Sequence, residues 1–150
     1  MKKEFQSIQT LHLALAAGSL LIFLMFYFVL GLNESDNYKE LPLHYLIPAF
    51  LAMCIFMSKF MDRKMKASIK KEDSLSQKLT QYRERVIRRS ALIEGAALFT
   101  LVFMYLTGNT LFAIYVGVGW LALLWVRPTL TEFVRDYGLS GQEQQEMSRD

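Results

Sequence analysis

One stretch of the chain limits its fold more than any other: the 22 residues from Leu11 to Leu32 contain no Asp, Glu, Lys or Arg. An α-helix of that length rises about 33 Å, enough to cross a hydrocarbon layer about 30 Å thick. Lys2 and Lys3 precede it, as in a secretory signal. However, the block is longer than a signal's apolar region, and NESDNYKE after it offers no small-residue cleavage site. We therefore expect a membrane-spanning helix.

Three further apolar blocks predict an all-α fold, an integral membrane four-helix bundle. They occupy residues 43–61, 91–107 and 110–126. The last two are short, but they can span if Arg88, Arg89 and Arg127 extend their charged ends to the membrane interface. Gly108 and Asn109 both tolerate a positive φ, so the short link between these two blocks predicts antiparallel neighbouring helices.

The loop charges predict the topology. Residues 62–90 carry ten Lys or Arg and four Asp or Glu, a net charge of +6, whereas residues 33–43 carry a net charge of −2. Cytoplasmic loops are enriched in Lys and Arg, so residues 62–90 are expected in the cytoplasm and residues 33–43 outside the cell. Four crossings then place both termini in the cytoplasm of a cell bounded by this plasma membrane.

The second and third helices are expected to continue beyond the membrane as a cytoplasmic hairpin over residues 62–90, helical over 62–71 and 74–90. An apolar stripe at helical spacing runs before the third span, at Leu75, Leu79, Tyr82 and Val86. Met65 and Ile69 are expected to face that stripe. Ser74 and Gln77 form a capping-box pattern at its start. The Lys and Arg side chains would then cover the outer surface of the hairpin.

The end of the chain predicts a short amphipathic helix over residues 129–137. Pro128 interrupts the preceding helix, Thr129 and Glu132 form a capping-box pattern, and Gly138 supplies a stop. We expect this helix on the inner membrane surface or against the hairpin, and a mobile tail over residues 139–150.

The two halves of the chain resemble each other at an offset of 77 residues, which suggests an internal repeat of two parallel hairpins. The alternative is that Leu, Ala, Gly and Phe recur in any helical membrane protein. Three spans share a small-xxx-small pattern, which lets helix backbones approach closely. The residues are Ala14 and Gly18, Ala91 and Gly95, and Ala113 and Gly117. They predict helix packing inside the bundle or, alternatively, an oligomer interface.

Glu94 is the one acidic residue well inside a predicted span. A charge at that depth costs several kcal/mol unless it is paired, neutralised or hydrated, so it is a candidate for function. We expect its side chain to face the bundle interior near the cytoplasmic end, and to pair with Arg127, His12 or a neighbouring Arg, or to stay protonated and donate a hydrogen bond. The alternatives are proton or cation handling and the binding of a partner protein.

Several chemistries have no support in the sequence. One Cys and two His give no basis for a disulfide framework or a metal site. Phosphate-binding glycine loops and nucleophile motifs do not occur. We therefore expect no catalytic, metal or cofactor-binding residues, and a non-enzymatic membrane accessory or scaffolding protein. The alternative is a small ion- or solute-translocating protein that uses Glu94.

The basic excess on the cytoplasmic side suggests three kinds of partner. It can simply set topology, or it can bind anionic membrane lipids or an acidic partner subunit, in a membrane complex or a homo-oligomer. Nucleic acid is not expected, because no nucleic-acid-binding motif accompanies the charge.

The segment RSALIEGAALF from Arg89 to Phe99, followed by LTGN and RPTLTEFVRDYGLS, resembles an uncharacterised family of small four-helix membrane proteins of Bacteroidota-type bacteria. The resemblance covers nearly the whole chain and implies a location in the bacterial inner membrane, without a known activity. ALIEG also looks like the carboxylate helix of rotary ATPase proteolipids. The partner helix of those proteins is a glycine ladder, whereas the first helix here has only Gly18 and Gly31, so a rotary function is not expected.

Overall fold

The computed structural model describes residues 2–30, 42–69 and 72–149, and every regular element within these ranges is helical. The elements are α1 Lys2–Met25 with a π-helical extension η1 Phe26–Leu30, α2 Leu43–Ala67, α3 Leu75–Thr107, α4 Phe112–Trp125, α5 Leu130–Tyr137 and α6 Gly141–Arg149. The predicted all-α fold class is confirmed. Residues 33–41 of the expected external loop lie outside the described residues.

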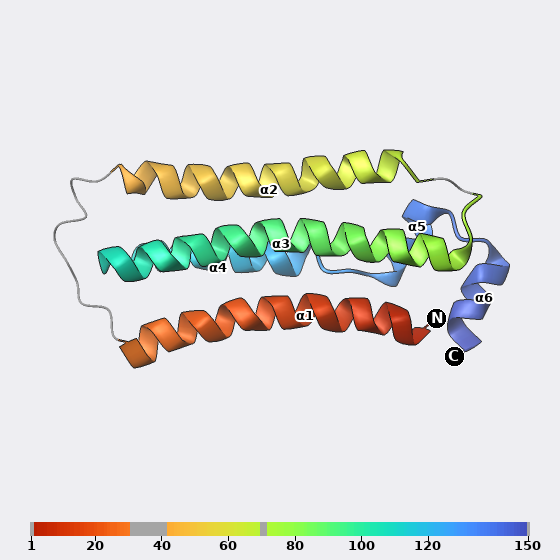
Figure 1. Cartoon of the computed structure of the whole chain (residues 1–150), viewed down its shortest axis with the longest axis horizontal. Helices are drawn as coiled ribbons and strands as arrows, with labels where there is room; N and C mark the ends of the chain where they lie inside the picture. Colours follow the sequence, from red (N-terminus) through yellow and green to blue (C-terminus); the bar gives the residue numbers. More distant parts are fainter. Residues whose placement is uncertain (1, 31–41, 70–71, 150) are drawn as a thin grey trace.

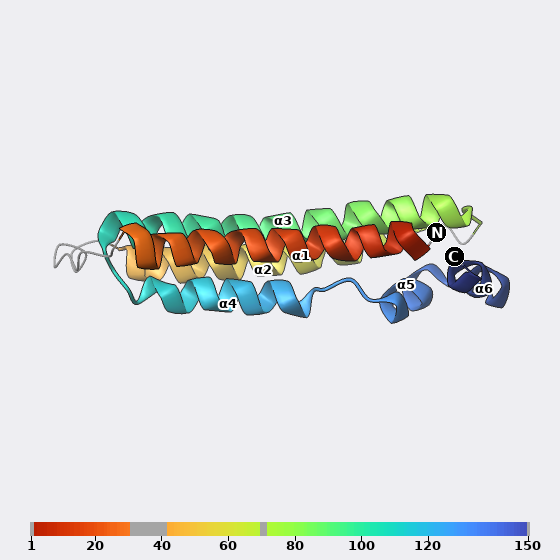
Figure 2. The same cartoon turned by 90° about the horizontal axis from the view of Figure 1, so that it is seen from below.

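Helix α3 is the centre of the molecule. Helices α1 and α2 lie along its two flanks, and α4 lies on one side of all three (Figures 1 and 2). α3 packs against α1, α2 and α4, whereas α1 and α2 are not among the closely packed pairs. The predicted repeat of two equivalent hairpins is therefore not seen in the described part of the chain, because α3 lies between the helices of the first hairpin.

Three helical segments are long and apolar enough to cross a membrane: Lys2–Phe28, Leu43–Ala67 and Leu75–Thr107. Helix α4 has only 14 residues, about 21 Å, which is less than a hydrocarbon layer. It counts as a fourth span only together with α5, and the two are bent by 60°. The fourth predicted span is therefore shorter than residues 110–126.

The apolar stripe of α3 is buried as predicted, but against other partners. Leu75, Leu79, Tyr82 and Val86 form one core cluster with Phe5 and Ile8 of α1, Phe133 and Tyr137 of α5, and residues near the C-terminus. Ile69 reaches only the margin of this cluster. The expected antiparallel packing of α2 on α3 is confirmed (Figure 1), and Ile69 does pack against this cluster. Met65 is not a member of the cluster, and residues of α1 and α5 cover most of the stripe.

The predicted boundaries of the hairpin hold at one end only. Ser74 caps α3, with both hydrogen bonds of the capping box to Gln77 in place. Helix α2 ends at Ala67, so the prediction of a helix to residue 71 was too long. At the other end of α3, Gly108 adopts a left-handed conformation with φ of 65°, which turns the chain into α4.

The tail that we expected to be mobile contains α6. The Ser140 hydroxyl accepts a hydrogen bond from the Glu143 amide, and the Glu143 carboxylate accepts one from the Ser140 amide. Lys78 of α3 then holds Glu143 at 2.8 Å, and the Met147 side chain is buried. Local capping and a tertiary ion pair together order this segment.

Candidate functional site

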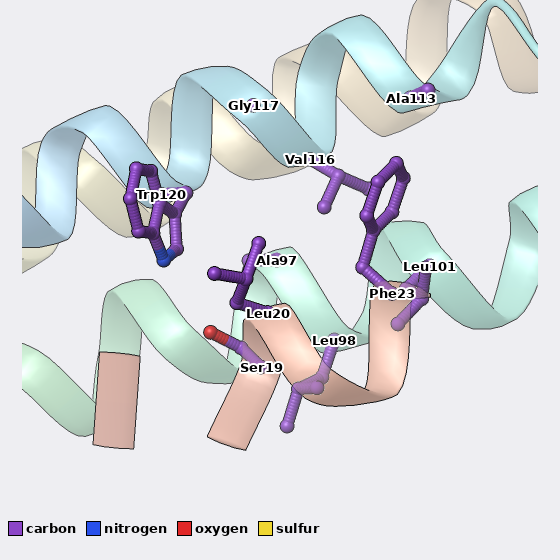
Figure 3. Close-up of a pocket in the computed structure, with 10 residues that line it drawn as sticks. All are labelled: Ser19, Leu20, Phe23, Ala97, Leu98, Leu101, Ala113, Val116, Gly117 and Trp120. Carbon is purple, nitrogen blue, oxygen red and sulfur yellow. The ribbon is translucent and has the colours of Figure 1, made fainter. Parts of the chain in front are cut away.

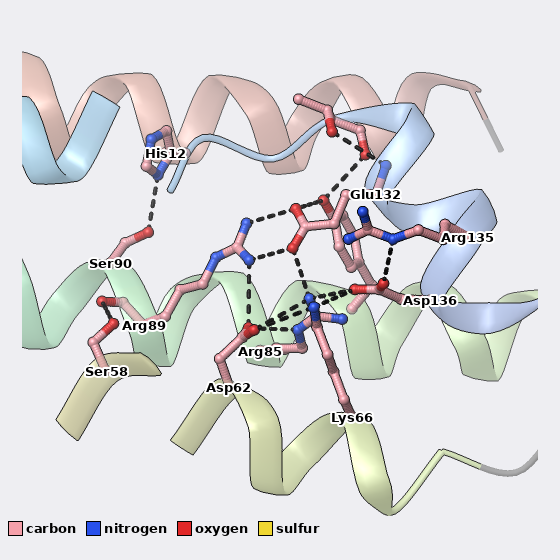
Figure 4. Close-up of polar contacts among 12 residues, drawn as sticks. His12, Ser58, Asp62, Lys66, Arg85, Arg89, Ser90, Glu132, Arg135 and Asp136 are labelled. Atoms are coloured by element: carbon pink, nitrogen blue, oxygen red, sulfur yellow. Dashed lines mark hydrogen bonds and ion pairs between the residues drawn. The ribbon is translucent and has the colours of Figure 1, made fainter. Parts of the chain in front are cut away.

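A cluster of charged side chains fills the core between α2, α3 and α5 (Figure 4). We call it the charged cluster. Its members are Asp62, Lys66, Arg85, Arg89, Glu132, Arg135 and Asp136. Helix α5, which contributes Glu132, Arg135 and Asp136, lies at the end of the bundle that also holds the start of α1 and helix α6 (Figure 1).

Arg85 is the centre of the charged cluster and is 1% exposed. Its Nε donates to Asp62 at 2.6 Å. Its Nη2 donates to Glu132 at 2.6 Å and to Asp136 at 2.7 Å. One arginine of α3 therefore connects α2 and α5 through three carboxylates.

Arg89, one turn further along α3, forms a bidentate ion pair with Glu132. Nη1 donates to Oε1 at 2.5 Å and Nη2 to Oε2 at 2.9 Å. This fork-to-fork geometry is the strongest form of a charge-assisted hydrogen bond. The Tyr82 hydroxyl donates to the same carboxylate at 3.1 Å, so Glu132 has partners on three residues of α3.

The electrostatics of the cluster favour its charged state. Burial alone would raise the pKa of Asp62, but the hydrogen bond from Arg85 and the charges of Arg85 and Arg89 hold it below its ordinary value. Burial would also raise the pKa of Asp136, but the hydrogen bonds from Lys66 and Arg85 outweigh burial, so the pKa of Asp136 is lowered as well. Both carboxylates therefore stay ionised at neutral pH.

The expectation that the Lys and Arg residues of 62–90 cover an outer surface holds only in part. Arg63, Lys64, Arg83 and Arg88 are exposed, whereas Lys78, Arg85 and Arg89 are buried. A signal was present in the sequence: Arg85 and Arg89 lie three residues after Tyr82 and Val86, so both fall within the buried stripe. The Thr129 hydroxyl does cap α5, but the Glu132 side chain is engaged by the arginines.

His12 is buried in α1, and its Nδ1 lies 2.9 Å from the Ser90 hydroxyl of α3. This contact ties the two helices together next to the charged cluster (Figure 4). We had expected His12 to pair with Glu94, but it pairs with Ser90 instead.

Glu94 makes no hydrogen bond or ion pair with the described residues, and its side chain is half-buried. It lies one turn after Ser90, which places it on the side of α3 that faces α1. Arg127 is exposed and lines a groove with Arg89 and Ile93. The predicted pair of Glu94 with Arg127 or His12 is therefore wrong, because Arg127 follows the end of α4 toward a different side of α3.

Ala113 packs against the core between α3 and α4, but the other small residues do not form the predicted internal contacts. Ala14, Ala91, Gly95 and Gly117 are exposed, and Gly18 and Ala113 are half-buried. A Cβ added at Gly18, Gly95 or Gly117 would meet nothing within 4 Å. The close approach occurs at Gly119 instead, where an added Cβ would lie 2.9 Å from the Ala97 Cβ. For the exposed small residues the alternative given above, an oligomer interface, stays a prediction.

A small apolar cavity of about 100 Å³ lies between α1, α3 and α4 (Figure 3). Trp120 closes one side, and its indole nitrogen donates to the Ala16 carbonyl at 3.0 Å. The only side-chain hydroxyl on its wall is that of Ser19, which donates to its own helix backbone. A cavity with such a lining is suited to staying dry.

Within the described residues, no group of three or more His, Cys, Asp or Glu side chains is placed to hold a metal ion. Searches of family models, curated proteins and solved structures found no match to the chain. The resemblance to the bacterial four-helix family therefore stays a prediction.

Proposed function

We propose that this chain is a non-enzymatic accessory or scaffolding protein of the bacterial inner membrane, with both termini in the cytoplasm. The distribution of its surface supports the membrane location. Large apolar side chains are exposed on α2, α3 and α4 and on the extension η1 of α1, for example Phe28 (74%), Phe56 (68%), Leu106 (69%) and Trp125 (82%). Charged side chains are buried at one end instead. A membrane would cover the apolar surface that water penalises.

The unpaired carboxylate of Glu94 carries the proposal of a scaffolding role. It lies next to the exposed Ala91 and Gly95, which leave the backbone of α3 open to close approach. An unpaired charge in a span costs about 2.5–3.5 kcal/mol on insertion scales. A second membrane helix that donates a hydrogen bond to Glu94 would relieve that cost. We therefore place the partner contact on the exposed face of α3 that carries Ala91 and Gly95, beside the side that α1 covers.

Mild-detergent purification followed by mass measurement tests this proposal. We expect a stoichiometric complex, with another protein or a second copy, that is lost in Gly95→Leu and weakened in Glu94→Leu. Gly117→Leu is the matched control, because Gly117 is an equally open glycine on α4. Equal loss in the control, or a monomer for the native chain, would contradict the proposal.

A translocating role is the alternative that the same carboxylate allows, since intramembrane acids also serve as proton relays. Glu94→Gln separates the two roles, because the amide keeps hydrogen bonds but cannot carry a proton. In proteoliposomes, a proton or cation flux that Glu94→Gln abolishes while the complex stays intact would favour translocation.

A further inference from the structure

An open groove of about 670 Å³ lies where α4 ends, bounded by α2, α3, α4 and the start of α5. Its size is within the range of small-molecule sites in proteins. One part of its wall is apolar and the other is charged. The groove is therefore amphipathic along its length, unlike the apolar cavity beside Trp120.

The charged part of the groove has more cations than carboxylates. Within the charged cluster, Asp62, Glu132 and Asp136 balance Lys66, Arg85 and Arg89. Three further cations line the groove beyond this balance: Lys59, Arg127 and Arg135. Lys59 and Arg127 have no ion pair with the described residues, and the exposed Arg135 shares Asp136 at 3.1 Å. The groove therefore attracts an anion.

The apolar part of the groove is open to the surroundings. Val118, Leu121 and Trp125 line it and are 43%, 63% and 82% exposed. The Lys59 ammonium lies 5.0 Å from the centre of the Trp125 ring. Trp and Lys side chains commonly lie together at the level of lipid headgroups, so this pair marks the interface.

We propose that the groove binds one anionic phospholipid of the cytoplasmic leaflet. The phosphate lies among Lys59, Arg127 and Arg135, and an acyl chain lies along Val118, Leu121 and Trp125. A free phosphate would use the cations but leave the apolar wall uncovered, which is why we assign a lipid. The inference rests on the proposed membrane location and not on the proposed partner helix.

Lipid binding to the full chain in neutral detergent tests this assignment, with native mass spectrometry as the readout. Phosphatidylglycerol, phosphatidylcholine and inorganic phosphate are compared. The double variant Arg127→Gln, Arg135→Gln removes two groove cations, and Arg63→Gln, Arg83→Gln removes two exposed cations elsewhere. Ala122→Trp fills the groove without changing its charge. Thermal unfolding of each variant checks that it folds.

We expect phosphatidylglycerol to bind about tenfold more tightly than phosphatidylcholine, and the groove double variant to lose that preference, since each cation near an anionic lipid contributes to binding. The control pair keeps it within about twofold. If Ala122→Trp folds, it weakens binding of both lipids.

Three results would overturn the assignment. Equal binding of the two lipids would remove the anionic preference. Equal losses in the groove and control variants would indicate diffuse attraction without a site. Full displacement of the lipid by inorganic phosphate would identify a soluble anion as the ligand. The partner complex is measured separately, so its failure leaves each of these results interpretable.

Discussion

Arg89 and Glu132 meet in a two-armed ion pair although 43 residues separate them in the chain. The contact joins the middle of α3 to the first turn of α5, and Arg85 strengthens it from one turn away. Helix α5 has only eight residues, too few to be stable alone. Its position therefore depends on these charges and on Phe133 and Tyr137, which are buried in the same end of the bundle.

Replacing Arg85 with Leu should destabilise the protein strongly. The change leaves Asp62, Glu132 and Asp136 without their shared cation, and breaking a buried ion pair on one side costs about 3–5 kcal/mol. Arg83→Leu, an exposed position on the same helix, should change stability by less than about 0.5 kcal/mol. Unfolding in mild detergent, followed by circular dichroism, measures both. Equal stability of the two variants would contradict the structural role of Arg85.

The charged cluster should make stability depend on acid but not on mild changes of pH. The folded-state pKa values of Asp62 and Asp136 are lowered. Their contribution is therefore complete above the unfolded pKa of about 3.9 and disappears as the pH falls through the folded pKa. The buried His12 also responds to pH between about pH 7 and pH 5, so the native chain is compared with Asp62→Asn, which should have the lower Tm at pH 7. We expect the difference in Tm between the two proteins to be constant between about pH 7 and pH 5 and to shrink below about pH 4. A steep loss of that difference already above pH 5 would argue against this assignment.

Two glycines of α4 should respond in opposite ways to the same substitution. Alanine favours helix over glycine by about 1 kcal/mol, so Gly117→Ala should be neutral or stabilising. Gly119→Ala should lower Tm, because its Cβ would lie 2.9 Å from the Ala97 Cβ. Adding Ala97→Gly should restore part of the loss. Similar melting curves for both single variants would show that α3 and α4 are less closely packed.

The proposed topology can be read from cysteine accessibility. In a Cys54→Ala background, an impermeant thiol reagent added outside cells should label Asp36→Cys and leave Glu72→Cys unlabelled. The expectation follows from the net charges of +6 and −2 on the two loops. If only position 72 were labelled from outside, the orientation would be the opposite of the proposed one, and the proposed lipid would come from the outer leaflet.

Local signals in the sequence predicted the parts of the fold that depend on local physics. Ser74 and Thr129 cap the helices that their patterns indicated, and the stripe from Leu75 to Val86 is buried. The same reasoning would also have found α6, because Ser140 and Glu143 form the S-x-x-E pattern of a capping box.

The arrangement of the helices had no comparable local signal. Each of α1, α3 and α4 carries an open small residue, and only the tertiary packing decided that Gly119 would make the close contact. The partners of Arg85 come from positions 62, 132 and 136, so the charged cluster exists only after α5 has docked. For the same reason the partners expected for Glu94, Arg127 or His12, were wrong, because only the tertiary packing decides which side of α3 each of them approaches.

The dependence of α3 on α5 sets an order for biosynthesis. Two of the three carboxylates that neutralise Arg85 lie near the end of the chain, on Glu132 and Asp136. While the ribosome is still making α4, Asp62 is the one carboxylate of the charged cluster already available to Arg85 and Arg89. The bundle therefore closes at its charged end only after the last helices emerge, so a chain truncated before Thr129 exposes a cationic, incompletely packed end to quality-control proteases.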